Sequence, residues 1–289
     1  MPKRGRALTE SRHGLKRRLL WLALRRLIDY NEFKEVDWVN IKEIKEGLAA
    51  TRFEDLPDRL AVLEGDSRAG VKKLVEYYKK WYNKVLDERR RLQGLLYFER
   101  KYKEFGLICG VDEAGAGPLA GPVAAGAVIL PVDCVIEGLD DSKKLSPKKR
   151  QELSEIIRER AVAYAVVFVD NDEIDEINIL QARLKAMALA VDALEMQPGF
   201  VLFDGNKSPL IKIPHAAVTD GDSKSMSIAA ASVLAKVERD GLMDEYHEIY
   251  PEYGFDRHKG YGTAQHIEAI RRHGATPIHR QSFIRNLGW

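Results

Sequence analysis

The stretch from residue 108 to residue 130, ICGVDEAGAGPLAGPVAAGAVIL, constrains the fold more than any other part of the chain. An apolar run ends in two adjacent carboxylates, Asp112 and Glu113, and a second apolar run follows from Val123 to Leu130. Short apolar runs bounded by Gly and Pro indicate buried strands. Asp112 is therefore predicted at the end of a core strand, with Glu113 just beyond it. Carboxylates at this position are costly unless they are solvated in a turn or compensated by a cation, so a turn and a divalent-metal site are both open.

Length and composition indicate a soluble globular protein with one sizeable core and an accessory domain. The chain has 289 residues, of which 45% are hydrophobic and 31% charged. Its two cysteines, Cys109 and Cys134, form no disulfide framework and favour a reducing compartment. The apolar run from Leu19 to Leu24 is too short to span a bilayer, and no signal peptide is recognisable. We therefore expect a cytoplasmic protein with no membrane partner.

The small net charge hides a strong asymmetry along the chain. Residues 1–104 carry 26 Lys and Arg against 17 Asp and Glu, whereas residues 105–289 carry 20 against 27. A basic region followed by an acidic one suggests that an anionic polymer is held by the first and that metal-dependent chemistry takes place in the second. A merely solvated basic tail explains the charge of the N-terminal arm equally well.

The pattern divides the chain into three parts: a basic arm at 1–37, a helical extension at 38–105 and an α/β domain at 106–289. The arm contains a predicted amphipathic helix from Ser11 to Tyr30. In the extension, helices are expected at Asn40–Ala49, Phe53–Leu63 and Val71–Lys103. Gly106 is taken as the end of the extension.

In the third part, strands alternate with helices. Helices are predicted at 147–160 (with Ser146 as N-cap), 177–196, 223–250 and 263–272, and strands at 162–169 and 200–203, with a short extended piece at 211–214. Strands followed by crossover helices indicate an α/β core with a mixed sheet and flanking helices.

Two more acids are candidates to share a site with the first pair. Asp204 ends a predicted strand, as Asp112 does, and ligands in open α/β sheets collect at the carboxyl ends of strands. Asp222 stands where a helix begins; an N-cap role for Asp222 and a turn role for Asp204 stay open. Oxygen donors without His or Cys suit Mg²⁺ or Mn²⁺ rather than zinc, and two such ions can promote phosphodiester hydrolysis.

Several motifs in register resemble the signature of the ribonuclease HII family. They are VDEAGAGPLAGP (111–122), DSKKLS (141–146), DG (204–205), GD (221–222), IAAAS (228–232), AKVERD (235–240), HKGYGT (258–263) and HRQSF (279–283). The resemblance covers about residues 106–284, and residues 40–105 resemble the helical extension of longer bacterial members. A phosphate-binding P-loop is excluded because no Gly-Lys-Ser/Thr follows the glycine-rich turn.

The resemblance implies a ribonuclease H-like fold and an endoribonuclease. Such an enzyme cuts the RNA strand of RNA/DNA hybrids and incises duplex DNA 5′ to a single ribonucleotide, leaving 3′-hydroxyl and 5′-phosphate ends. Asp112, Glu113, Asp204 and Asp222 would be the catalytic carboxylates and would hold two Mg²⁺ or Mn²⁺ ions. Gly115, Ala116, Gly117 and Tyr261 would read the 2′-hydroxyl, and Lys143, Lys144 and Ser225 would also contact substrate. Asp240 would face solvent or make a packing contact, and a monomer is expected.

The sequence departs from the family pattern at two positions. The middle residue of Gly-x-Gly is normally basic but here is Ala116, and Asp220 stands where Lys is common. Losing a charged contact to phosphate costs about 1.5–3 kcal/mol, roughly ten- to a hundredfold. We hypothesise an active but weakened enzyme, with the basic residues 1–104 supplying affinity. The alternative is a catalytically impaired protein that binds ribonucleotide junctions; a ribonuclease HIII assignment is disfavoured by the tyrosine loop and the extension.

Overall fold

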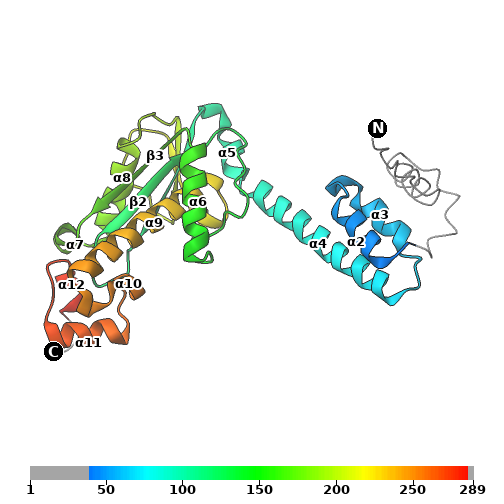
Figure 1. The fold of residues 1–289 in the computed structure, drawn as a ribbon. Coiled ribbons are helices and arrows are strands. Elements are labelled where there is room, and N and C mark those ends of the chain that lie inside the picture. The colour runs from blue at the N-terminus through cyan, green and yellow to red at the C-terminus, as the bar shows by residue number, and fades with distance from the viewer. Residues whose placement is uncertain (1–38, 286–289) are drawn as a thin grey trace, which may run out of the picture. The chain divides into compact units, whose positions relative to one another are not determined.

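The computed structural model describes residues 39–285, shown in colour in Figure 1. The chain divides into two compact units between Val85 and Leu86. The basic arm at 1–37, with its expected amphipathic helix, lies outside the described residues. The boundary near 104–106 between extension and α/β domain stays a prediction.

The described part of the first unit is a small helical assembly. It contains α2 (Ile41–Ala49), the 3₁₀ turn η1 (Phe53–Asp55), α3 (Leu56–Leu63) and the start of α4 (Ala69–Gly94). Asn40 caps α2, its side-chain oxygen accepting from the N–H of Glu43 at 2.9 Å. Apolar side chains spaced three and four residues apart meet in one core: Ile44, Leu48, Leu56, Leu60, Leu63, Val71 and Val75.

The second unit begins inside α4. The single helix expected from Val71 to Lys103 is wrong, because α4 ends at Gly94 and is followed by α5 (Tyr97–Lys101) and η2 (Lys103–Phe105). The helix ends where Leu95 and Leu96 are buried, each 2% exposed, in a core shared with the α/β elements. Burial of these two leucines outweighs the tendency of the flanking sequence to continue the helix.

A five-stranded mixed sheet forms the centre of this unit. The strands are β1 (Ile108–Ala114), β2 (Val123–Ile129), β3 (Ala163–Val169), β4 (Phe200–Asp204) and β5 (His215–Val218), in the order β3-β2-β1-β4-β5. β1 pairs antiparallel with β2 and parallel with β4, which confirms the mixed sheet. The fifth strand was expected at 211–214; it begins directly after Pro214, which has no N–H to donate to a ladder.

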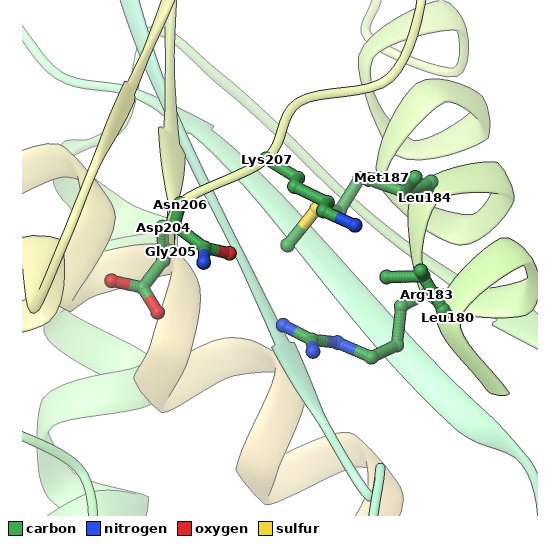
Figure 2. Close-up of a pocket in the computed structure, with 8 residues that line it drawn as sticks. All are labelled: Leu180, Arg183, Leu184, Met187, Asp204, Gly205, Asn206 and Lys207. Atoms are coloured by element: carbon green, nitrogen blue, oxygen red, sulfur yellow. The ribbon is translucent and has the colours of Figure 1, made fainter.

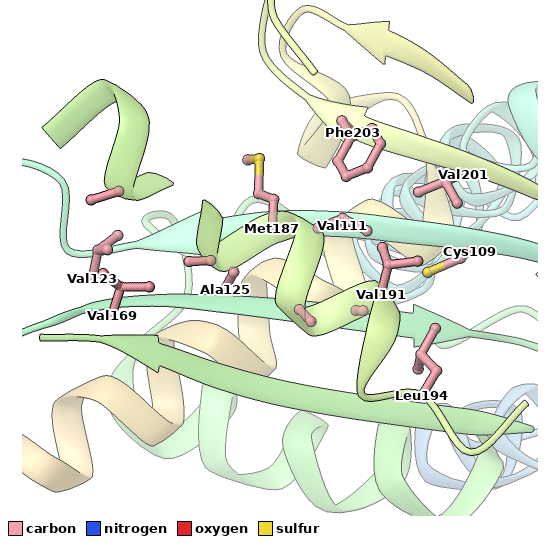
Figure 3. Close-up of a cluster of buried hydrophobic side chains, with 14 of the residues drawn as sticks. Cys109, Val111, Val123, Ala125, Val169, Met187, Val191, Leu194, Val201 and Phe203 are labelled. Carbon is pink, nitrogen blue, oxygen red and sulfur yellow. The ribbon is translucent and has the colours of Figure 1, made fainter. Parts of the chain in front are cut away.

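Helices cover both faces of the sheet. On one face, α8 (Ile179–Asp192) packs on side chains of β1, β2 and β4, among them Val111, Val123 and Phe203 (Figure 3). On the other, α9 (Met226–Ile249) and α6 (Pro147–Arg160) bury Val128 and Leu130. The helix expected over 177–196 corresponds to α8. Asn178, with a φ of 67°, separates it from α7 (Asn171–Ile177), which was not predicted.

Short helices complete the C-terminal part. They are η3 (Gly221–Ser223), η4 (Pro251–Tyr253), α10 (Phe255–His258), α11 (Ala264–His273) and α12 (Gln281–Ile284). Ser146 caps α6 as predicted, accepting from the N–H of Lys149 at 3.2 Å.

Candidate active site

The register of the sheet brings Asp112 and Asp204 side by side. β1 and β4 run parallel, and their last register pair is Val111 opposite Phe203. Asp112 and Asp204 are the next residues on the two strands, so their side chains lie next to each other at the same end of the sheet. The expectation that the two acids are neighbours is therefore confirmed. Their predicted place at a strand end holds only for Asp204, because β1 continues to Ala114 and both Asp112 and Glu113 pair with β2.

Alternation along β1 sends its two adjacent acids to opposite faces. Asp112 points to the α9 face, where Ser232 hydrogen-bonds to its carboxylate. Glu113 points to the α8 face, where Arg183 reaches it with Nη2 2.6 Å from Oε1. The pair thus joins the two helical layers at the end of the strand.

Asp222 approaches the same place on η3. The backbone N–H of Gly221 donates to Oδ1 of Asp204 at 2.6 Å, which ties η3 to the end of β4. Asp222 is 7% exposed, and its Oδ2 lies 3.9 Å from Nζ of Lys143. An N-cap role for Asp222 is wrong, because α9 is capped by Ser225, whose hydroxyl accepts from the N–H of Ile228.

Burial and mutual repulsion raise the pKa values of three carboxyl groups: Asp112, Glu113 and Asp222. Burial, then the charges of Glu113 and Asp204, hold the pKa of Asp112 well above its usual range. Burial also raises the pKa of Glu113, against the opposing pull of Arg183. The pKa of Asp222 rises to about 6 through burial and the charges of Asp141 and Asp204, with Lys143 opposing. The site therefore holds more negative charge than its cations neutralise.

The donor chemistry of these residues fits hard divalent cations. All four candidates offer carboxylate oxygens, and Oε2 of Glu113 is buried without a hydrogen-bond partner among residues 39–285. As the side chains stand, no group of three or more His, Cys, Asp or Glu in that range is arranged to hold a metal ion. Glu113 is turned to Arg183 and Asp204 to Gly221, so the carboxylates are engaged by groups of this chain.

Arg183 is a site residue that the sequence did not reveal. It lines a small cavity of about 20 Å³ together with Asp204, Asn206 and Lys207. Figure 2 shows its guanidinium extending from α8 toward Asp204, with Lys207 beside the same space. The cavity has room for about one water molecule. It places two cations and an amide beside the carboxylates.

The glycine-rich turn and Tyr261 lie against each other. Gly115 has φ +92°, and a Cβ there would lie 2.0 Å from Nε of Arg239, so only glycine fits. A Cβ on Gly117 would lie 3.7 Å from the ring of Tyr261, which is 43% exposed. Ala116 stands between the two glycines, half-buried. The structure thus brings together the residues predicted to read the 2′-hydroxyl.

Two fully buried arginines support this turn from behind. Arg280 donates to the carbonyls of Gly115, Ala116 and Gly121 at 2.7–3.1 Å. Arg239 donates to the carbonyls of Ala120, Pro122 and Lys259 at 3.0–3.1 Å. In the described part of the chain neither has an ion-pair partner, and burial followed by the charge of Arg239 lowers the pKa of Arg280 to about 9. Both lie in the family motifs, but their role was not predicted.

Two buried histidines, His266 and His279, form a hydrogen-bonded chain that ends at the Tyr261 carbonyl. Nδ1 of His279 accepts from the N–H of Thr276 at 2.9 Å, so its proton is on Nε2, which lies 3.0 Å from Nε2 of His266. His266 then carries its proton on Nδ1 and donates to the Tyr261 carbonyl at 3.0 Å. Burial lowers the pKa of each histidine to about 4, so the chain is neutral near pH 7.

The remaining predicted contacts differ in position. Lys143 is exposed beside Asp222, whereas Lys144 pairs with Asp140 at 3.3 Å. Ser225 is fully buried and donates to Glu99, so its surroundings do not support the predicted substrate contact. Asp240 makes the expected packing contact: it pairs with Lys236 at 2.5 Å and Arg150 at 3.6 Å.

A larger charged groove of about 530 Å³ adjoins Tyr261. Its lining includes Arg150, Lys236, Arg257 and Lys259 as well as Asp240, Asp244 and Asp256. Because both cations and acids line it, the groove is a polar surface next to the glycine-rich turn rather than a purely basic one.

A mixed sheet that brings Asp112 and Asp204 side by side on neighbouring strands, beside a glycine-rich turn, defines a hydrolase of the ribonuclease H fold, and comparison with known proteins gives the particular family. The family model for Ribonuclease HII matches residues 109–286, and that for the Ribonuclease HII N-terminal domain matches residues 40–103. The chain belongs to the ribonuclease HII family and is a metal-dependent nuclease.

Similar proteins cover most of the chain. Ribonuclease HII of Clostridioides difficile (strain 630) is 46% identical over 250 residues, covering 86% of this chain and 98% of that protein. Ribonuclease HII of Idiomarina loihiensis is 56% identical over 177 residues, covering 61% of this chain and 95% of that protein. The crystal structure of ribonuclease H2 from Pyrococcus horikoshii OT3 has a TM-score of 0.52 at 27% identity, covering 61% of this chain and 93% of that one. Ribonuclease HII in a PCNA complex from Archaeoglobus fulgidus has 0.51 at 26% identity, covering 62% and 94%.

Between residues 39 and 285 no helix is both long enough and apolar enough to cross a bilayer.

Proposed function

We propose that the chain is an endoribonuclease that cleaves the RNA strand of RNA/DNA hybrids and incises duplex DNA 5′ to a single ribonucleotide. One observation carries the proposal: the parallel register of β1 and β4 places Asp112 beside Asp204, with Glu113 and Asp222 at the same end of the sheet. Ribonuclease HII relatives support the substrate class.

Asp112, Glu113, Asp204 and Asp222 would hold two divalent ions, Mg²⁺ or Mn²⁺. When bound, such ions supply an activated water and stabilise the leaving oxygen, giving 3′-hydroxyl and 5′-phosphate products. The raised pKa values of Asp112 and Asp222 and the unpartnered Oε2 of Glu113 are consistent with carboxylates that a cation would compensate.

Discrimination between RNA and DNA would come from the glycine-rich turn. The turn lets backbone approach the substrate at Gly115 and Gly117, and the Tyr261 ring lies against Gly117. Because Arg239 and Arg280 hold the carbonyls behind the turn, its shape is set before substrate binds. The backbone N–H of Ala116 remains available for the 2′-hydroxyl, but no side-chain cation stands at this position.

The test is incision of an end-labelled DNA duplex that contains one ribonucleotide, with Mg²⁺ or Mn²⁺. An all-DNA duplex is the matched control, and an RNA/DNA hybrid is run in parallel. We expect a cut 5′ to the ribonucleotide, and about ten- to a hundredfold faster cleavage by Ala116→Arg, which restores a charged phosphate contact. Tight binding without cleavage by either protein would indicate the alternative, a protein that binds ribonucleotide junctions without turnover.

A further inference from the structure

Glu99 lies on α5, before the first strand, yet its carboxylate enters the start of α9. Its Oε1 accepts from the Ser225 hydroxyl at 2.6 Å, the Ser227 hydroxyl at 2.7 Å and the Ser227 N–H at 2.9 Å. Its Oε2 is buried without a hydrogen-bond partner in the described residues. Next to it, the N–H of Met226 donates to the carbonyl of Leu95 at 2.8 Å. The segment preceding the sheet thus holds the first turn of α9.

A carboxylate is well suited to this position. The first turn of a helix presents N–H groups without intrahelical partners and the positive end of the helix dipole. The Ser225 hydroxyl accepts from the N–H of Ile228 while donating to Glu99. Glu99 is therefore linked through Ser225 to a second backbone N–H of this turn. Hydrogen bonds to an ionised acceptor are about twice as strong as neutral ones.

The turn held by Glu99 directly follows η3, which carries Asp222. The N–H groups of Lys224 and Ser225 both donate to the carbonyl of Gly221, at 2.9 and 2.8 Å. The N–H of Gly221 in turn donates to Asp204. The short segment from Gly221 to Ser225 is therefore fixed at one end by Asp204 and at the other by Glu99.

The first turn of α9 also lies directly on β1. A Cβ on Gly110 would come within 2.2 Å of the backbone of both Ser227 and Ile228, so the helix touches the strand two residues before Asp112. A shift of this turn would change the position of Asp222 relative to Asp112 and Asp204 together. Glu99 is the only charged side chain among the described residues that hydrogen-bonds to the side chain of Ser225 or to Ser227.

We propose that Glu99 is a positioning residue for the nuclease: through Ser225 and Ser227 it sets where Asp222 stands in the carboxylate site. The inference rests on the metal-binding role proposed for Asp222. It makes α5 part of the scaffold of the active site. Because Glu99 reaches the site through Ser225 and Ser227, we expect its loss to act on metal affinity and turnover rather than on duplex binding.

The experiment compares Glu99→Ala, Glu99→Gln and Ser227→Ala with the unchanged full chain. Glu104→Ala removes an exposed acid of the neighbouring η2 and serves as the matched control. Turnover and KM are measured on the ribonucleotide-containing duplex, and Mn²⁺ binding is measured separately by electron paramagnetic resonance of the free ion. Circular dichroism establishes that each variant is folded.

We expect Glu99→Ala to lower kcat and weaken Mn²⁺ binding by about 10- to 100-fold, the range typical for partners that orient metal ligands. KM for the duplex should stay within about twofold, and Glu99→Gln should fall between Ala and the unchanged chain because the amide oxygen still accepts. The double variant Glu99→Ala/Ser227→Ala should lose no more than Glu99→Ala, because the two residues act through one contact.

Folded Glu99 variants with unchanged kcat and Mn²⁺ affinity would overturn the inference. If Glu99→Ala does not fold, Glu99→Gln and Ser227→Ala decide in the same way. An unchanged chain that neither cuts the duplex nor binds Mn²⁺ would instead overturn the proposed function, which separates the two failures.

Discussion

The two halves of the candidate site are stabilised in opposite ways. The carboxylate half, made of Asp112, Glu113, Asp204 and Asp222, collects negative charge, and burial and repulsion raise the pKa values of three of its members. The turn half, made of Gly115, Ala116, Gly117 and Tyr261, is backed by two buried arginines, each of which donates to three carbonyls. One half therefore carries charge that a cation would relieve, whereas the other is already complete. We therefore expect a mutation in the carboxylate half to lower activity without lowering stability. A mutation of the arginines behind the turn half should lower the stability of the fold.

The largest effect is expected from Asp112→Asn in the carboxylate half. Activity should fall by more than about a hundredfold, since even indirect partners of metal ligands are worth about 10- to 100-fold. The melting temperature without metal should be unchanged or higher, because a buried charge among like charges is removed. Asp192→Asn, an exposed acid on α8, is the control for both measurements. A clear drop in melting temperature would contradict the view that repulsion among the buried carboxylates destabilises the fold without metal.

In the turn half, Arg280→Met should destabilise the fold. Three carbonyls lose their donor, and leaving buried acceptors unpaired costs about 1–3 kcal/mol each, so we expect at least about 3 kcal/mol in the free energy of unfolding. Urea unfolding monitored by circular dichroism measures it, and the exposed Arg272→Met controls for loss of an arginine as such. Equal stability of the two variants would show that the buried guanidinium does not hold the turn.

The histidine chain beneath Tyr261 makes the turn half sensitive to acid. The pKa values of His266 and His279 are lowered to about 4 in the fold, from an ordinary value near 6.5, so the unfolded chain binds more protons between these values. Stability from this pair is present above pH 6.5 and is lost as the pH falls toward 4, by roughly 3 kcal/mol for each histidine. Urea unfolding at pH 7 and pH 4.5 should show this loss. In His279→Gln the difference between the two pH values should shrink; an equal difference would count against the assignment.

The smallest effect is expected at the ion pair between Arg183 and Glu113. If Glu113 holds a divalent ion as proposed, the guanidinium competes with that ion for the same carboxylate, and a partly exposed ion pair is worth about 1 kcal/mol. Arg183→Met should therefore lower the Mg²⁺ concentration for half-maximal cleavage by about fivefold. Arg272→Met again serves as control. A higher Mg²⁺ requirement in Arg183→Met would mean that the arginine assists the site instead of competing with the ion.

The sequence predicted the parts of the site that follow from local pattern. Asp112 and Asp204 each follow an apolar run, and the glycine spacing around Ala116 marks a turn, so the meeting of the two acids could be expected. Arg183 and Glu99 could not be predicted, because their contacts depend on which helix face meets which strand end. The family resemblance implied a substrate contact for Ser225; in the structure its hydroxyl caps α9 and donates to Glu99.

The errors in the elements have similar physical causes. Asn178 has a positive φ that an apolar period does not reveal, so the start of α8 and the preceding α7 were not predicted. Leu95 and Leu96 fit the helical repeat of α4, but their burial in the second unit ends that helix at Gly94. At Gly94 tertiary contacts outweigh local preference.

The parallel pairing of β1 with β4 also sets the order of events during folding. Asp112 and Asp204 are 92 positions apart in the chain, so the carboxylate site does not exist until this long-range pairing has closed. Divalent ions that need both strands bind only the completed sheet. Their stabilisation therefore appears as slower unfolding, with the rate of refolding unchanged.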